Sequence, residues 1–125
     1  MLSALMLLAA VPNCDDPQTQ SAMTACAGAA FKAADVALNA QWKVTHGFMK
    51  ERDAAIGAAD ADGRPGYAAA LLEAQRAWLE FRDAQCGVEG YAARGGSMEP
   101  MLVNSCLADL TRRRTDQLKD LVWEH

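Results

Sequence analysis

The sequence predicts an all-α fold, a small bundle of three to four helices stapled by two disulfides. Apolar residues recur at helical spacing over long stretches, and no strand-like alternation continues for more than a few residues. The four cysteines fall into two local pairs. The chain has 125 residues, 51% of them hydrophobic and many of them alanine, which suits one domain of closely packed helices.

The first twelve residues are uncharged and almost all apolar. They are fewer than the roughly 20 residues that a membrane-spanning helix needs. They are typical of the apolar core of a secretory signal, with small residues at Ala9 and Ala10 for cleavage; a short buried or amphipathic helix is the alternative. We therefore expect residues 1–12 to be a signal peptide or apolar N-terminal segment, and residues 13–125 to form a single helical domain.

The first helix is predicted to begin at Pro17, with Asp15 or Asp16 as its cap, because proline suits the first turn and carboxylates favour its positive end. Residues 57–66, which include Asp60–Gly66, are rich in turn formers and predict a loop. The core-facing row expected on this helix consists of Phe31, Leu38, Trp42, Met49 and Ile56.

The second helix is predicted from about Tyr67 to Ala93, and Gly95-Gly96 ends it. Ser97 is the predicted N-cap of a third helix, which tolerates Pro100 in its first turn. The expected inner row of the second helix is Leu71, Ala74, Trp78, Phe81 and Gln85. The expected inner row of the third helix is Val103, Cys106, Leu110, Leu118 and Leu121.

The cysteine spacing predicts the pairs Cys14–Cys26 and Cys86–Cys106. The second pair is centred on Gly96, so helices running into and out of that turn would place both cysteines level, within the roughly 4.4–6.8 Å Cα separation of a disulfide. The first pair flanks Asp15-Asp16-Pro17, where the chain can fold back along the first helix. Disulfides indicate an oxidising compartment, so we expect a periplasmic or secreted protein.

Polar residues on the first two helices predict a structural polar network between them. Asp35 and Asn39 are expected to meet Gln75 and Arg82, with Asp83 beside them, because a buried arginine needs a carboxylate partner. The alternative is that Gln75, Arg82 or Asp83 faces a partner protein.

Signs of catalysis are few. Glu73, Glu80 and Asp83 could bring two carboxylates to one side of the second helix, as glycosidases require, but carboxylates on an exposed helix face are usually only solvated. His46 has no second ligand at metal-binding spacing, and the chain lacks a phosphate-binding loop. We therefore expect no catalytic residue, no metal and no cofactor. The net charge of −4 argues against a general nucleic-acid binder.

Five segments together resemble the LprI-like lysozyme-inhibitor family: Cys14…Cys26, Ala34–Trp42, Gln75–Cys86, Gly95–Met98 and Cys106–Arg114. The most specific is the Gln-x-x-Trp-x-x-Phe-Arg-Asp-x-x-Cys pattern that ends at Cys86. The resemblance implies a small exported bacterial helical domain with two disulfides. One branch of the family, a mycobacterial lipoprotein, is associated with inhibition of lysozyme. The family supplies no catalytic residues.

The resulting expectation is a noncatalytic, exported protein-binding domain of the bacterial cell envelope, with lysozyme as a candidate partner. Lysozymes are commonly basic proteins with an acidic cleft, so the candidate binding element is the turn Arg94, Gly95, Gly96 and Ser97; the alternative is that its glycines only make a tight turn. Two different functions are also consistent with the sequence. One is a structural or stress-related envelope protein that binds through Asp60–Gly66 or Arg112–Arg114, and the second is a hydrolase using Glu80 and Asp83. No nucleic-acid partner and no membrane span in the mature form are expected.

Overall fold

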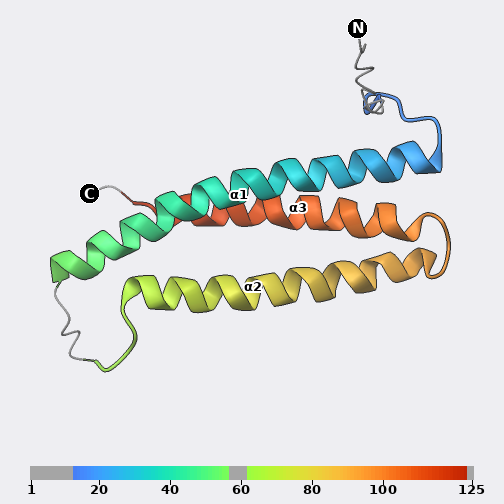
Figure 1. The fold of residues 1–125 in the computed structure, drawn as a ribbon. Coiled ribbons are helices and arrows are strands. Elements are labelled where there is room, and N and C mark those ends of the chain that lie inside the picture. The colour runs from blue at the N-terminus through green and yellow to red at the C-terminus, as the bar shows by residue number, and fades with distance from the viewer. Residues whose placement is uncertain (1–12, 57–61, 124–125) are drawn as a thin grey trace, which may run out of the picture.

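The computed structural model describes residues 13–56 and 62–123, and there the protein is all-helical (Figure 1). The elements are α1 (Gln20–Ile56), α2 (Tyr67–Gly90), the 3-10 turn η1 (Tyr91–Ala93) and α3 (Glu99–Asp120). Helices α1 and α3 run in the same direction, and α2 runs antiparallel to both (Figure 1). The all-α prediction and both disulfide pairs are confirmed. The apolar segment 1–12 lies outside the described residues.

Helix α1 begins at Gln20, so the prediction of a start at Pro17 was wrong. The capping residue is Thr19, whose Oγ1 accepts a hydrogen bond from the backbone N–H of Ala22 at 3.0 Å. The Cys14–Cys26 disulfide, with a Cα separation of 5.5 Å, requires the segment before the helix to turn back. That turn uses the residues expected to start the helix.

Helix α2 is capped by a side chain from α1. The carboxylate of Asp53 accepts hydrogen bonds from the backbone N–H groups of Tyr67, at 2.7 Å, and Ala68, at 3.1 Å. Its negative charge also lies at the positive end of the α2 dipole. Gly66 makes room for this contact, because a Cβ at that position would lie 2.8 Å from Asp53 Oδ1.

Small and polar residues fill much of the interface between α1 and α3, which pack together along most of α3 (Figure 1). Thr45 is fully buried and donates a hydrogen bond to the backbone oxygen of Leu118 at 2.9 Å. Leu38, Met49, Leu71 and Leu118 form the apolar core cluster. The other buried small residues of this interface are Ala34, Ala108, Thr111 and Thr115.

The inner face of α2 differs from the predicted one. Phe81 is 54% exposed, and Ile56 at the end of α1 is 50% exposed, so the prediction that both lie in the core was wrong. Leu71 of the predicted row is buried and Trp78 packs against the core, but the other buried side chains of α2 lie on the neighbouring line. The buried residues of α2 are Leu71, Gln75, Arg82, Cys86 and Gly90.

The two ends of the bundle are held differently. Both disulfides lie toward the end where α1 begins and α2 passes into α3 (Figure 1). At the opposite end the guanidinium of Arg52 lies 5.3–5.9 Å from the ring centroids of Phe48, Tyr67 and Trp123. None of the helices in the described part of the chain is both long enough and apolar enough to cross a membrane.

Candidate functional site

The turn between α2 and α3 is exposed and internally hydrogen-bonded. The guanidinium of Arg94 lies 4.5 Å from the centre of the Tyr91 ring. Gly95 has a φ of 78°, a conformation that suits glycine, and its N–H donates to Glu99 Oε1 at 3.2 Å. The N–H of Gly96 donates to the backbone oxygen of Ala93 at 2.8 Å. These contacts hold Arg94 at the tip of the bundle.

Ser97 is exposed but does not cap α3. The N-cap is Met98, which makes no side-chain capping bond, and Pro100 lies in the first turn as expected. Instead, the N–H of Glu99 donates to the backbone oxygen of Gly96 at 3.3 Å. The tight turn positions the start of α3 through its backbone, so no capping side chain is needed there.

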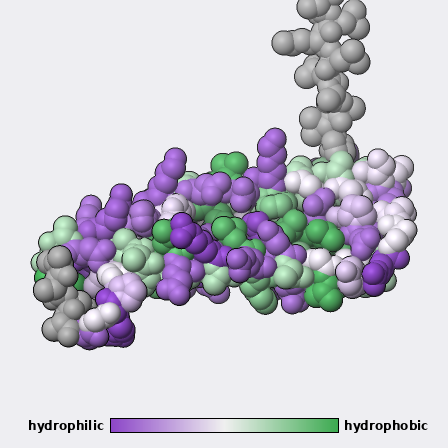
Figure 2. All heavy atoms as spheres, turned by 60° about the horizontal axis from the view of Figure 1, so that its bottom comes forward, coloured by the Kyte–Doolittle hydropathy of each residue, from purple (hydrophilic) through white to green (hydrophobic). Residues whose placement is uncertain are grey.

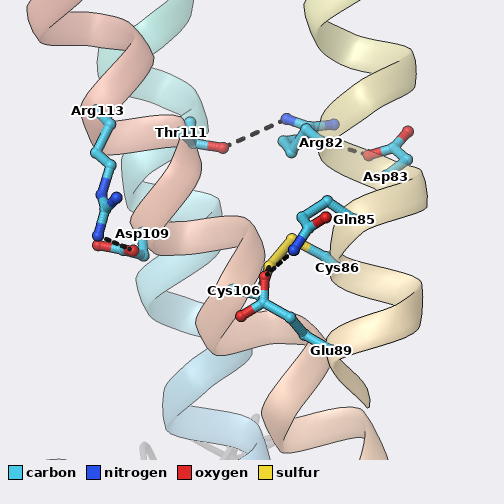
Figure 3. The surroundings of a disulfide bond; sticks show 9 residues. All are labelled: Arg82, Asp83, Gln85, Cys86, Glu89, Cys106, Asp109, Thr111 and Arg113. Atoms are coloured by element: carbon cyan, nitrogen blue, oxygen red, sulfur yellow. Dashed lines mark hydrogen bonds and ion pairs between the residues drawn. A yellow bond between two sulfur atoms is a disulfide. The ribbon is translucent and has the colours of Figure 1, made fainter. Parts of the chain in front are cut away.

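The Cys86–Cys106 disulfide joins α2 to α3 behind this turn (Figure 3). Its Cα atoms are 5.3 Å apart and Cys86 is fully buried. Glu89 Oε2 lies 2.9 Å from Cys106 Sγ, but a disulfide sulfur carries no proton to donate, and Gln85 Nε2 donates to the same oxygen at 3.3 Å. Because both sulfurs are bonded to each other, Cys86, Glu89 and Cys106 do not form a thiolate metal site.

Arg82 lies near the middle of the bundle and is buried, with only 8% of its surface exposed. It donates to Asp83 at 3.0 Å and, across to α3, to the hydroxyl of Thr111 at 3.4 Å (Figure 3). Its Nη1 lies 3.9 Å from Asp35 Oδ1, and its guanidinium lies 5.2 and 5.3 Å from the Phe31 and Trp78 ring centres. Asp35, Arg82 and Asp83 are therefore brought together.

Gln75 and Asn39 are arranged differently from the expected network. Gln75 is buried, and its Oε1 accepts a hydrogen bond from Arg114 Nε of α3 at 2.9 Å. Burial lowers the pKa of the Arg114 guanidinium. Asn39 is exposed and shares only a shallow depression between α1 and α2 with Asp35 and Gln75. The polar contacts of α2 thus reach α3 as well as α1.

The other candidate groups lie on the surface. Glu73, Glu80 and Asp83 are exposed, and Asp83 is held by Arg82. Arg112 and Arg113 are exposed, and Arg113 pairs with Asp109 one helical turn away at 3.0 Å. In the loop before α2, hydrogen bonds from Arg64 lower the pKa of Asp62; Asp60 lies outside the described residues.

Sequence reasoning missed several partners of these groups. Tyr91 precedes Arg94 by three residues, a spacing that places side chains next to each other on a helical turn and could have identified it. Glu99, which accepts the Gly95 N–H, also lies within one turn of it. Thr111 and Arg114 are contributed by α3, far away in the sequence, and no local pattern indicates their pairing with α2.

Comparison with known proteins identifies the family. A family model described as "Lysozyme inhibitor LprI" matches residues 13–118. An uncharacterized protein of Rhizobium meliloti (strain 1021) is 45% identical over 111 residues, which are 89% of this chain and 79% of that protein. No solved structure matches. The match spans all three helices, both disulfides and the α2–α3 turn, and the chain belongs to the LprI lysozyme-inhibitor family.

Proposed function

We propose that this protein is a noncatalytic, exported protein-binding domain of the bacterial cell envelope that inhibits a lysozyme through the turn Arg94–Ser97. Family membership supports the inhibitor function, and the two disulfides support a periplasmic or secreted location. The observation that carries the proposal is an exposed arginine on a turn whose backbone is already held by hydrogen bonds.

The chemistry of Arg94 matches the target. Lysozyme cleaves glycosidic bonds with a pair of acidic residues in its substrate cleft. A guanidinium offers paired N–H donors to a carboxylate, so Arg94 can bind there. Gly95 and Gly96 follow it without side chains, which lets the backbone enter a narrow cleft. The negative net charge of the chain would also attract a basic lysozyme over longer distances.

The rigidity of the turn supports tight binding. Three contacts restrain the turn in the unbound protein. They are the Tyr91 ring against Arg94, the Glu99 contact to Gly95 and the disulfide behind the turn. A segment that is ordered in advance loses less conformational entropy on binding.

The test is a bacterial cell-lysis assay in which the oxidised protein is titrated against a panel of lysozymes. We expect stoichiometric inhibition of at least one lysozyme. Arg94→Ala should weaken it at least about tenfold, which corresponds to about 1.4 kcal/mol of binding free energy. The matched control is Arg113→Ala, because Arg113 is also an exposed arginine but lies on α3 away from the turn.

Two results would contradict the proposal. If no lysozyme in the panel is inhibited, the inhibitor function is wrong. If Arg94→Ala inhibits as well as the wild type, the turn is not the binding element. A hydrolase would behave in the opposite way, because there Glu80→Gln or Asp83→Asn would abolish a turnover that the wild-type protein shows alone.

A further inference from the structure

Helix α2 carries a second apolar row that is not used inside the bundle. Phe81 and Val88 on this row are 54% and 55% exposed. The exposed alanines that continue the row at alternating spacings of four and three residues are Ala70, Ala74, Ala77 and Ala84. Spacings of four and three describe one face of a helix that packs against another helix. Figure 2, which brings the α2 side forward, shows apolar side chains among hydrophilic ones.

Two copies of this row have complementary side-chain sizes when the helices are antiparallel. In an antiparallel pair of α2 helices whose two-fold axis is level with residue 79, Phe81 of one copy faces Ala77 of the other. In the same register Val88 faces Ala70, and Ala74 faces Ala84. Each of the two large side chains then meets a small one, which lets two helices approach closely and pack without voids.

The charges beside the row agree with this register. Arg76 and Glu80 are exposed on the same flank of α2. In an antiparallel pair with its two-fold axis level with residue 79, this flank of one helix lies beside the same flank of the other. Arg76 of each copy then lies near Glu80 of the other copy. Along the helix axis the two Glu80 side chains lie in the middle with one Arg76 beyond each of them, so the two carboxylates are flanked by arginines on both sides. A contact between identical surfaces of this kind closes after two copies.

We propose that the Ala70–Val88 row of α2 is a homodimer interface, in which two copies of this chain pair through antiparallel α2 helices. The other face of α2 holds the bundle together, so dimerisation does not require any helix to move. The turn Arg94–Ser97 lies beyond the paired row and is free to bind a lysozyme. The interface is therefore independent of the proposed inhibition.

The test is the molar mass of the oxidised protein by sedimentation equilibrium from about 1 to 300 µM, a range that covers weak homodimers. We expect the weight-average mass to rise across this range from near that of one chain toward that of two. Phe81→Arg should keep the mass of a single chain throughout. The matched control is Val36→Arg, because Val36 is also an exposed apolar residue, on α1, and this variant should still dimerise.

A charge exchange tests the register. Arg76→Glu places four carboxylates around the axis and should prevent dimerisation, whereas the double variant Arg76→Glu/Glu80→Arg should restore it. All these positions are exposed, so unchanged helical circular dichroism is expected and checks that each variant folds.

Three outcomes would overturn the proposal: a wild-type protein that stays a monomer, a Phe81→Arg variant that still dimerises, or a Val36→Arg variant that fails to dimerise. A monomeric wild type would leave the α2 row to a different partner protein. Phe81→Arg should inhibit lysozyme as the wild type does, so failure of this proposal is distinguishable from failure of the proposed function.

Discussion

Replacing Arg82 by alanine tests how the middle of the bundle is held. Removing one partner of a fully buried ion pair destabilises a protein by about 3–5 kcal/mol, largely because the other charge is left buried. Here the side chains of Asp35 and Asp83 are 45% and 65% exposed, so water can solvate both carboxylates once the arginine is gone. The penalty for a stranded charge is therefore small.

The remaining losses come from the contacts of the guanidinium itself. Its contacts with the rings of Phe31 and Trp78, at 5.2 and 5.3 Å, are worth about 1 kcal/mol each. The hydrogen bond to the fully buried Thr111 hydroxyl contributes about 1 kcal/mol more. We expect Arg82→Ala to lower the free energy of unfolding by about 3 kcal/mol. Arg82→Met should lower it by about 1–2 kcal/mol, because methionine loses the Thr111 hydrogen bond but its thioether can replace part of the contacts with the Phe31 and Trp78 rings.

The assay is urea unfolding of each oxidised variant, with the midpoint compared at constant slope. Arg113→Ala is the control, because its exposed pair with Asp109 should contribute only about 0.3–0.5 kcal/mol. A loss of less than about 1 kcal/mol for Arg82→Ala, as at an ordinary surface site, would refute the reasoning. Equal losses for the alanine and methionine variants would refute the share of the loss assigned to the ring contacts.

Two further stability predictions use glycine and cysteine substitutions. Gly66→Ala should destabilise the protein by about 1–2 kcal/mol, as loss of a helix cap does, because its Cβ would displace the Asp53 carboxylate; Gly87→Ala, in open space inside α2, should stabilise it by about 0.5–1 kcal/mol. Thermal melting should show a lower melting temperature for Gly66→Ala and a higher one for Gly87→Ala. Shifts of the same sign in both variants would contradict this prediction. Replacing the Cys86–Cys106 pair by serine should cost about 3 kcal/mol, whereas replacing Cys14–Cys26 should cost less than about 1 kcal/mol, because only an exposed terminal segment is released. Urea unfolding midpoints of the two double variants check which loss is larger. A larger loss for the Cys14–Cys26 variant would contradict the prediction.

The disulfides and the number of long helices could be predicted from the sequence because both depend on short-range patterns. Gly96 lies midway between Cys86 and Cys106, so a tight turn there places the two cysteines side by side whatever the rest of the chain does. The cap of α1 was harder to predict, since Asp15, Asp16 and Thr19 are all good capping residues. Thr19 is the cap because the Cys14–Cys26 disulfide requires residues 15–18 to form the turn before the helix.

The inner face of α2 could not be predicted from hydrophobicity. The predicted row is buried at Leu71 but exposed at Phe81, whereas Gln75 and Arg82 of the neighbouring row are buried. Gln75 and Arg82 can be buried because Arg114 and Thr111 of α3 supply their partners. Those partners are about 30 to 40 residues away in sequence, so only the tertiary arrangement identifies them.

The position of the disulfides links the stability of this fold to its proposed function. The interface of α1 and α3 is filled largely by alanine and threonine, which bury less apolar surface than leucine or phenylalanine and so contribute less hydrophobic free energy. A bundle with such a core gains comparatively more from covalent bridges. Both bridges lie toward the end that carries Arg94 (Figure 1). Formation of the disulfides in an oxidising compartment therefore both stabilises the bundle and restrains the proposed binding turn.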